Sequence, residues 1–295
     1  MKSVFAYLIL FTFSVNIIIA EVPAAEKEAL IEFYQATNGE KWTNQWNLNS
    51  DVSKWHGIKV INNHVTEINL FKNNLSGTIP GSIGKLKSLT SLNLAFNSLT
   101  GELPEEMVNL VRLRTLKLEM NRFKGELPIA MGDMKSLEEF TAFNNFLTGA
   151  IPESIGKIKN LKVLNLSSNS LKGDIPKSLG SLSSLESLGL FENTLEGAIP
   201  AEIGQLTKLK ELVLANNQLG GEVPSEFDQL ASLEVFQIQN NKFESVKNLE
   251  RIRSSHEFLV FDYDRDDIKL DFKDPNFSKT RMADTKFEDE EGIDK

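Results

Sequence analysis

The sequence has 295 residues, of which 41% are hydrophobic and 25% charged, a balance typical of soluble globular proteins and sufficient for a sizeable core. Its 32 Lys+Arg against 41 Asp+Glu give a net charge of −9, which argues against partners such as nucleic acid or an anionic membrane surface. The absence of cysteine excludes disulfides, zinc–thiolate centres and cysteine nucleophiles, and only three histidines remain for metal binding or acid–base catalysis.

The first twenty residues have the layout of a secretory signal peptide. Lys2 precedes an apolar run that reaches Ile19, and the small residue Ala20 stands at the expected cleavage position. The alternative is an N-terminal membrane anchor, but the run is short for a span and two polar residues interrupt it. We therefore predict a signal peptide over residues 1–20, an extracellular or cell-surface location, and no membrane span after signal cleavage.

A helix is predicted next, over residues 23–36, PAAEKEALIEFYQA. Pro23 suits the first turn of this helix, and an apolar stripe includes Leu30 and Phe33. The three tryptophans of the chain follow the helix directly. Because the end of a stacked structure exposes its core unless something covers it, we expect residues 21–64 to form an N-terminal cap with the tryptophans in its core. Sugar binding by these rings is the alternative.

The central part of the sequence repeats every 24 residues. In each period a Leu-x-Leu alternation predicts a short strand buried on one side, and such strands stack in parallel about 4.8 Å apart. An asparagine follows the strand, where its amide can satisfy backbone groups freed by a turn, and a glycine then allows positive φ. The repeated asparagines, interpreted as a structural ladder, are Asn73, Asn97, Asn121, Asn145, Asn169, Asn193, Asn217 and Asn241.

Two units show the pattern clearly: LTSLNLAFNSLTGELP at residues 89–104 and LKVLNLSSNSLKGDIP at residues 161–176. They resemble the plant-type leucine-rich repeat, LxxLxLxxNxLxGxIPxxIGxLxx. The resemblance implies an α/β leucine-rich repeat solenoid, with a curved parallel sheet on the concave face, short helical turns on the convex face and a helical N-terminal cap. It places eight repeats in residues 65–247.

The cap departs from the plant pattern in one respect. Plant members of the family usually place a cysteine pair around the W-x-G-V segment, whereas WHGIKV at residues 55–60 has no cysteine beside it and Val60 fills one of the expected positions. In this feature the chain is similar to cysteine-free bacterial surface proteins with the same repeat, while the repeat itself resembles receptor-like ectodomains and polygalacturonase inhibitors. We expect packing to replace the disulfide.

The resemblance implies ligand binding through the concave sheet, and the strand register identifies its exposed positions. Large apolar side chains at exposed positions, with polar groups around them, are typical of recognition sites. The alternative is that they lie flat on the sheet and cover their neighbours. The candidate ligand-binding residues are Phe71, Phe96, Glu119, Met120, Phe143, Phe191 and Glu192.

The exposed positions of the concave sheet also differ in charge along the chain. Five glutamates and two lysines give these positions a net charge of −3: Glu67, Glu119, Glu139, Glu192, Glu211, Lys72 and Lys117. Toward the C-terminus the positions are polar and neutral, which suits hydrogen bonding to a sugar or a peptide backbone. These residues are Ser167, Ser168, Asn216, Gln237, Gln239 and Asn240.

The C-terminal part is acidic and does not continue the repeat. We predict a C-terminal cap over residues 248–281, with a strand around residues 258–261 that covers the last coil. Residues 282–295 are predicted to be a disordered acidic tail.

Nothing in the sequence predicts catalysis, a metal site or a cofactor. It has no phosphate-binding glycine loop and no nucleophile elbow, and the histidines are too far apart along a solenoid to converge. The prediction is therefore a secreted or cell-surface binding module, without enzymatic activity, whose partner is an extracellular protein or peptide and not nucleic acid. The alternatives are an inhibitor of an extracellular polysaccharide-degrading enzyme and a glycan-binding or cell-wall structural protein.

Overall fold

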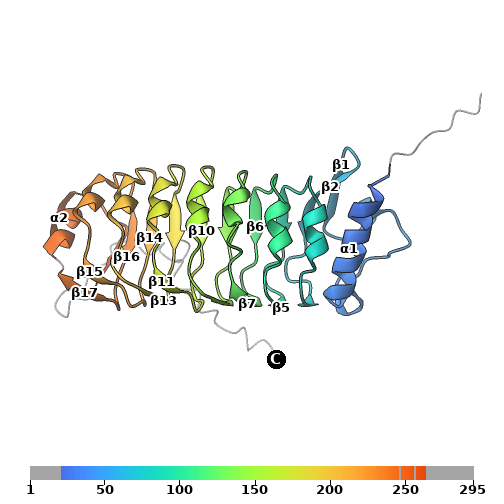
Figure 1. Ribbon diagram of the computed structural model, residues 1–295, viewed down its shortest axis with the longest axis horizontal. Coiled ribbons are helices and arrows are strands. Elements are labelled where there is room, and N and C mark those ends of the chain that lie inside the picture. Colours follow the sequence, from blue (N-terminus) through green and yellow to red (C-terminus); the bar gives the residue numbers. More distant parts are fainter. Residues whose placement is uncertain (1–20, 246, 256, 264–295) are drawn as a thin grey trace, which may run out of the picture.

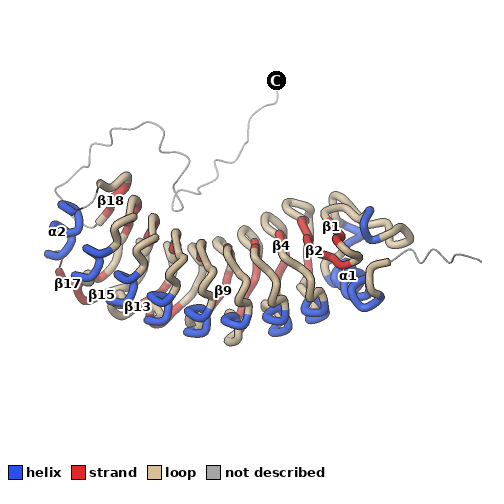
Figure 2. Tube along the Cα trace, turned by 90° about the horizontal axis from the view of Figure 1, so that it is seen from above, coloured by secondary structure: helices blue, strands red, loops and turns tan. Residues whose placement is uncertain are grey.

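The computed structural model describes residues 21–245, 247–255 and 257–263 (Figure 1). The predicted signal peptide, the predicted acidic tail and most of the predicted C-terminal cap lie outside these residues. The described coils stack side by side into an elongated arc, with strands on its inner side and helical turns on its outer side (Figure 2). This arrangement confirms the predicted leucine-rich repeat solenoid.

A ten-stranded sheet lines the inner, concave side of the arc. Each Leu-x-Leu strand pairs in parallel with the strands one period away, so that Leu164 of β10 lies between Phe140 and Leu188. Among the described strands of this sheet, β1 and β2 are the one antiparallel pair. In sheet order the strands are β1 (Ile58–Ile61), β2 (His64–Asn69), β4 (Ser91–Asn93), β6 (Thr115–Lys117), β8 (Glu139–Thr141), β10 (Val163–Asn165), β12 (Ser187–Gly189), β14 (Glu211–Val213), β16 (Val235–Gln237) and β18 (Val260–Asp262).

Short strands in three smaller sheets follow the asparagine of each coil. The repeated glycine has φ between 69° and 99° in all seven coils that carry it, as the sequence predicts, which turns the chain outward at this point. The strands are β3 (Ser76–Gly77), β5 (Ser98–Gly101), β7 (Arg122–Glu126) and β9 (Phe146–Thr148) in one sheet, β11 (Lys172–Asp174) and β13 (Thr194–Glu196) in another, and β15 (Gly220–Glu222) and β17 (Lys242–Ser245) in the third.

The helical turns of the convex side are 3-10 turns. Six of the seven start directly after the repeated proline, which fixes φ and cannot donate a hydrogen bond. Each turn buries one apolar side chain, such as Ile155, against the back of the sheet. The turns are η3 (Gly81–Lys85), η4 (Glu105–Asn109), η5 (Met131–Asp133), η6 (Glu153–Lys157), η7 (Lys177–Ser181), η8 (Ala201–Gln205) and η9 (Ser225–Gln229).

The repeated asparagines connect neighbouring coils through backbone groups. The Nδ2 of Asn169 donates to the carbonyls of Ala142, Leu166 and Ser167 at 3.0–3.1 Å, and its Oδ1 accepts from the N–H of Leu147 at 3.0 Å. Asn73 extends the arrangement into the cap, where its Oδ1 accepts from the backbone N–H of Asn44 at 2.7 Å. From Asn97 to Asn241, each asparagine therefore satisfies backbone groups in its own coil and in the preceding one.

The N-terminal cap combines helix α1 (Ala24–Ala36), the 3-10 turns η1 (Gly39–Lys41) and η2 (Val52–Lys54), and a buried aromatic cluster. Trp42 packs edge-on against Trp46 with ring centroids 4.9 Å apart, and Trp55 stacks on Trp46 at 4.9 Å. The three indole N–H groups donate to backbone carbonyls at 2.8–3.0 Å. The predicted tryptophan core of the cap is therefore present, and aromatic packing and hydrogen bonds hold the cap together.

The C-terminal end of the described structure carries helix α2 (Lys247–Ser255) and strand β18. The expected strand around residues 258–261 is found at Val260–Asp262, where it pairs with β16 and extends the concave sheet. Within the described residues, no helix has the length and apolar character needed to cross a membrane.

Candidate binding surface on the concave sheet

Two phenylalanines form an aromatic pair at the N-terminal end of the concave sheet. Phe71, which is 49% exposed, follows β2, and its ring centroid lies 5.1 Å from that of Phe96 in the next coil. Beside them, a hollow of about 490 Å³ is lined by His56, Gly57, Ile58, Lys59, Glu67, Asn69 and Phe71. This end of the sheet therefore offers an open depression with an apolar wall and charged edges.

Phe96 and Met120 share an unusual backbone conformation. The residue before each ladder asparagine has φ between 48° and 58°, in the left-handed region that disfavours large side chains. Asparagine, which tolerates this region well, stands there in three coils, as Asn144, Asn216 and Asn240. Phe96 and Met120 have φ of 57° and thus cost roughly 1–3 kcal/mol of strain each, which points to a role beyond packing.

Glu119 lies in the floor of the sheet rather than on its rim. The residue is only 9% exposed, and its Oε2 accepts a hydrogen bond of 2.5 Å from Thr141 Oγ1 in the next coil. Burial raises the pKa of this carboxyl above its ordinary value, although the hydrogen bond from Thr141 opposes the shift. Next to it, Lys117 pairs with Glu139 at 2.9 Å. Glu119 was predicted at an exposed position, and the structure corrects this, because neighbouring side chains on the sheet cover it.

The C-terminal half of the sheet is more apolar than the sequence indicated. Val213, Val235 and Val260 form a buried cluster on the concave side, and Phe191 packs against it. Val213 and Val235 occupy repeat positions that the strand register directs to the concave side, whereas Val260 joins them only because β18 pairs with β16. Phe191 therefore belongs to a second apolar cluster, separated along the sheet from the Phe71–Phe96 pair.

Two of the six polar residues expected to face a ligand in this half are buried. Ser167 is 1% exposed and Gln237 is 6% exposed, and the Nε2 of Gln237 donates to Asp262 of β18 at 3.0 Å. Glu192, in contrast, is exposed and accepts a hydrogen bond from Ser168 Oγ at 2.8 Å. The expected polar surface is therefore confined to the rim, because strand packing covers the short side chains at the centre.

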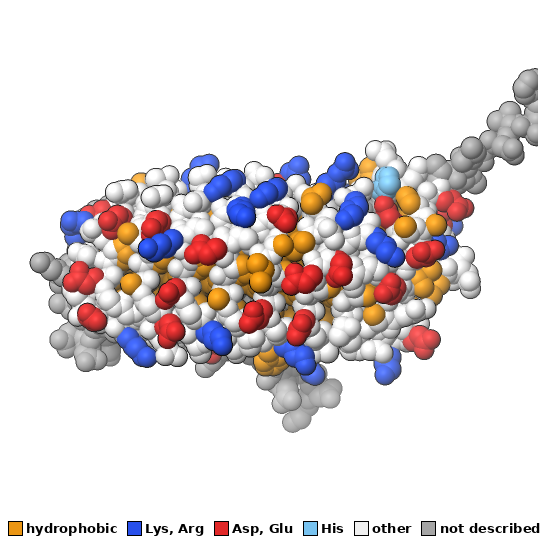
Figure 3. All heavy atoms as spheres, viewed as in Figure 1, with side chains coloured by type: hydrophobic (Ala, Val, Ile, Leu, Met, Phe, Trp, Pro, Cys, Tyr) orange, Lys and Arg blue, Asp and Glu red, His pale blue; other side chains and the backbone are white. Residues whose placement is uncertain are grey.

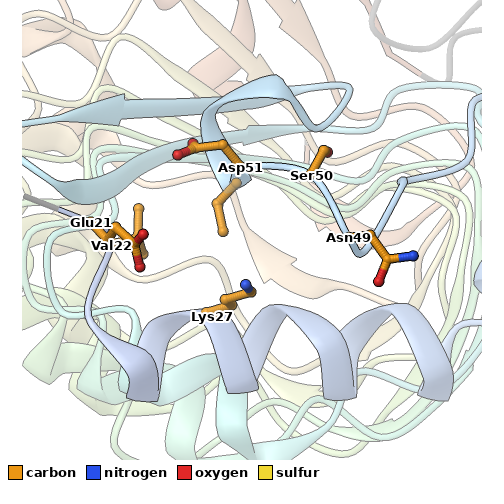
Figure 4. A pocket seen from close by; sticks show the side chains of 7 residues that line it. Glu21, Val22, Lys27, Asn49, Ser50 and Asp51 are labelled. Carbon is orange, nitrogen blue, oxygen red and sulfur yellow. The ribbon is translucent and has the colours of Figure 1, made fainter. Parts of the chain in front are cut away.

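Hollows of about 490 Å³ beside Gly84 and about 470 Å³ beside Gly156 also open between the convex turns, but no aromatic side chain of the described residues lines them. On the face seen in Figure 3, where the 3-10 turns lie, acidic and basic side chains are mixed and hydrophobic ones form a broken line between them. In the cap, a hollow of about 220 Å³ lies between α1 and residues 49–52, and the side chain of Lys27 points from α1 into it (Figure 4). The described residues contain no cluster of histidine and acidic groups that could hold a metal ion.

Comparison with known proteins identifies the repeat. A family profile described as a leucine-rich repeat region matches residues 68–174, and a second leucine-rich repeat profile matches residues 208–230. The chain is a leucine-rich repeat protein of the plant type. No curated protein sequence matches it significantly.

Solved structures of plant receptor ectodomains are similar to this leucine-rich repeat protein. The ectodomain of the receptor kinase GASSHO1/SCHENGEN3 from Arabidopsis thaliana, in complex with CASPARIAN STRIP INTEGRITY FACTOR 2, is 31% identical over 81% of the chain and 29% of its own, with a TM-score of 0.76. The plant peptide hormone receptor RGFR1, in complex with RGF2, is 42% identical over 60% and 28%, with a TM-score of 0.59.

The Arabidopsis receptor kinase HAESA, in complex with the peptide hormone IDA and the co-receptor SERK1, is 38% identical over 61% of this chain and 30% of its own, with a TM-score of 0.59. This leucine-rich repeat protein thus spans less than a third of the length of each of the three receptor chains. The sequence has no cysteine, which distinguishes its cap from the plant pattern.

Proposed function

We propose that this protein is an exported binding module that recognises an extended peptide, or an extended segment of a protein, along its concave sheet. The observation that carries the proposal is the aromatic surface of the first coils, where Phe71 is exposed beside Phe96 and a hollow opens next to them. Exposed aromatic side chains beside a depression are the usual anchors of a recognition site.

The strained positions support the same surface. Phe96 and Met120 occupy a left-handed backbone position that asparagine fills in three other coils, so packing of the repeat does not require a large apolar side chain there. Similar plant ectodomains bind peptide hormones, and this supports a peptide as the ligand class. The enzyme-inhibitor and glycan-binding alternatives remain predictions of the sequence, and no feature of the described residues favours either of them.

The test uses peptides selected from a displayed library on the wild-type protein. The variant Phe96→Asn/Met120→Asn copies the residues that this chain itself uses at the equivalent position, so its backbone remains compatible with the fold. We expect this variant to bind the selected peptides at least about tenfold more weakly, a loss of roughly 1.4 kcal/mol.

The matched control is Ile129→Asn, which removes a 77% exposed apolar side chain in the loop before η5, away from the concave sheet. Its affinity for the selected peptides should equal that of the wild type. Equal losses in both variants, or no loss in the concave variant, would place the binding site elsewhere.

A further inference from the structure

The chain leaves the described structure at one end of the concave sheet. Strand β18 is the outermost strand of that sheet and pairs with β16. Tyr263, the last described residue, follows this strand and packs against the core. Residues 264–295 therefore follow directly after the C-terminal edge strand of the concave sheet.

These remaining residues have a marked charge pattern. Residues 272–287, FKDPNFSKTRMADTKF, contain three phenylalanines, four basic residues and two acidic residues, which gives a net charge of +2. The preceding stretch, 264–271, has four acidic and two basic residues, and the following stretch, 288–295, has five acidic residues and one basic residue. Residues 272–287, named the tail segment, are thus a cationic aromatic stretch between two acidic ones.

The concave sheet is complementary to the tail segment in both respects. The positions on its concave side carry four exposed or half-buried glutamates, the buried Glu119 and two lysines, a net charge of −3. Burial raises the pKa values of Glu119 and Glu211 because their charges lack full solvation. The phenylalanines of the tail segment match the apolar surface formed by Phe71, Phe96 and Met120. Opposite charge and shared apolar character are the two conditions for docking an extended chain on this face.

The tail segment is also long enough. Phe272 follows Tyr263 by nine positions, which span up to about 30 Å when extended, and residues 272–287 span up to about 50 Å more. The sheet positions from β18 to β4 are seven strand spacings apart, or about 34 Å at roughly 4.8 Å each. The tail segment can therefore cover the sheet from the Phe191 cluster to the Phe71–Phe96 pair.

We propose that residues 272–287 of this chain dock on its own concave sheet and compete there with the external partner. The inference goes beyond the proposed function, since it assigns an intramolecular occupant to the face, and it does not depend on the identity of the partner. Because the contact is partly electrostatic, added salt weakens it.

The absence of cysteine allows a direct crosslinking test in the full chain. The test variant is Ser91→Cys/Ser278→Cys, with one thiol on concave strand β4 and the other in the tail segment. The control is Ser178→Cys/Ser278→Cys, whose first thiol lies on convex turn η7; Ser91 and Ser178 are both half-buried, and both changes are nearly isosteric.

At micromolar protein we expect the concave pair to form its intramolecular disulfide at least about fivefold faster than the convex pair, although Ser178 lies in a coil closer to the C-terminal end. Adding Lys279→Glu/Arg281→Glu should remove most of this difference, as should raised salt. Equal rates for the two pairs would overturn the proposal. Disulfide-linked dimers in place of crosslinked monomers would also overturn it, since a second copy would then be the occupant.

The two proposals fail separately. If the thiols do not crosslink while Phe96→Asn/Met120→Asn still weakens the selected peptides, the tail segment is not the occupant and the binding function stands. If crosslinking is fast while the concave variant binds those peptides normally, the tail segment docks and the external site lies elsewhere.

Discussion

The hydroxyl of Thr141 donates a hydrogen bond to the carboxylate of Glu119 at 2.5 Å, and this bond joins two neighbouring coils in the floor of the concave sheet. Lys117 of β6, two residues before Glu119, forms an ion pair with Glu139 at 2.9 Å. A carboxylate is thus held at the centre of the surface with a neutral partner, and its charge is poorly solvated.

We predict that Glu119→Gln stabilises the protein near pH 7. Burial raises the folded-state pKa of Glu119 above the unfolded value, so the folded state binds the carboxyl proton more tightly than the unfolded state does. The folded protein therefore loses stability as pH rises from the unfolded pKa through the folded pKa. Glutamine keeps an acceptor for Thr141 without the charge. In urea unfolding between about pH 4 and pH 8, the variant should have the higher free energy of unfolding, and its difference from the wild type should shrink as pH falls. A constant or reversed difference would contradict a raised pKa of Glu119.

Glu138→Gln should behave in the opposite way. This carboxylate pairs with Lys162 and with Arg114, each at 2.7 Å, and the hydrogen bond from Lys162 is the main reason why its pKa is lowered. The stability it provides is present above its unfolded pKa and is lost as pH falls through the folded value. The pairs lie at the surface, so we expect a loss below about 1 kcal/mol at neutral pH, which high salt abolishes.

Asn169→Ala should reduce the free energy of unfolding by about 1–3 kcal/mol, because it leaves the buried N–H of Leu147 without a partner and removes one hydrogen bond from each of three carbonyls. Asn109, an exposed residue at the end of η4, provides the control, and Asn109→Ala should change stability by less than about 0.5 kcal/mol. Similar effects of the two substitutions in denaturant unfolding would contradict the structural role of the ladder.

The cap has its own test at Glu26. This buried carboxylate accepts from the backbone N–H of Val65 at 2.8 Å and contacts His64 Nδ1 at 2.6 Å, and so joins α1 to β2. Glu26→Ala should cost about 1–3 kcal/mol by leaving the Val65 N–H unpaired. Since the three tryptophans are all in the cap, their fluorescence reports its unfolding directly. An unchanged fluorescence transition would show that this link does not hold the cap.

The positions of the repeat could be predicted from the sequence because each position has a local physical requirement. Alternation around Leu164 specifies a strand, an asparagine such as Asn169 specifies a turn with free backbone groups, and glycine specifies positive φ. These requirements recur every 24 residues, so neighbouring coils impose the same register on each other and leave one architecture.

The tertiary structure decided which side chains on the concave face are accessible. The sequence placed Glu119, Ser167 and Gln237 at exposed positions, but their neighbours one coil away cover them, because side chains on parallel strands about 4.8 Å apart pack against each other. The tertiary structure also brought Val260 into the same cluster as Val213, because β18, a strand outside the repeat, extends the sheet. Periodicity within one coil therefore determined the fold, whereas contacts between coils determined the binding surface.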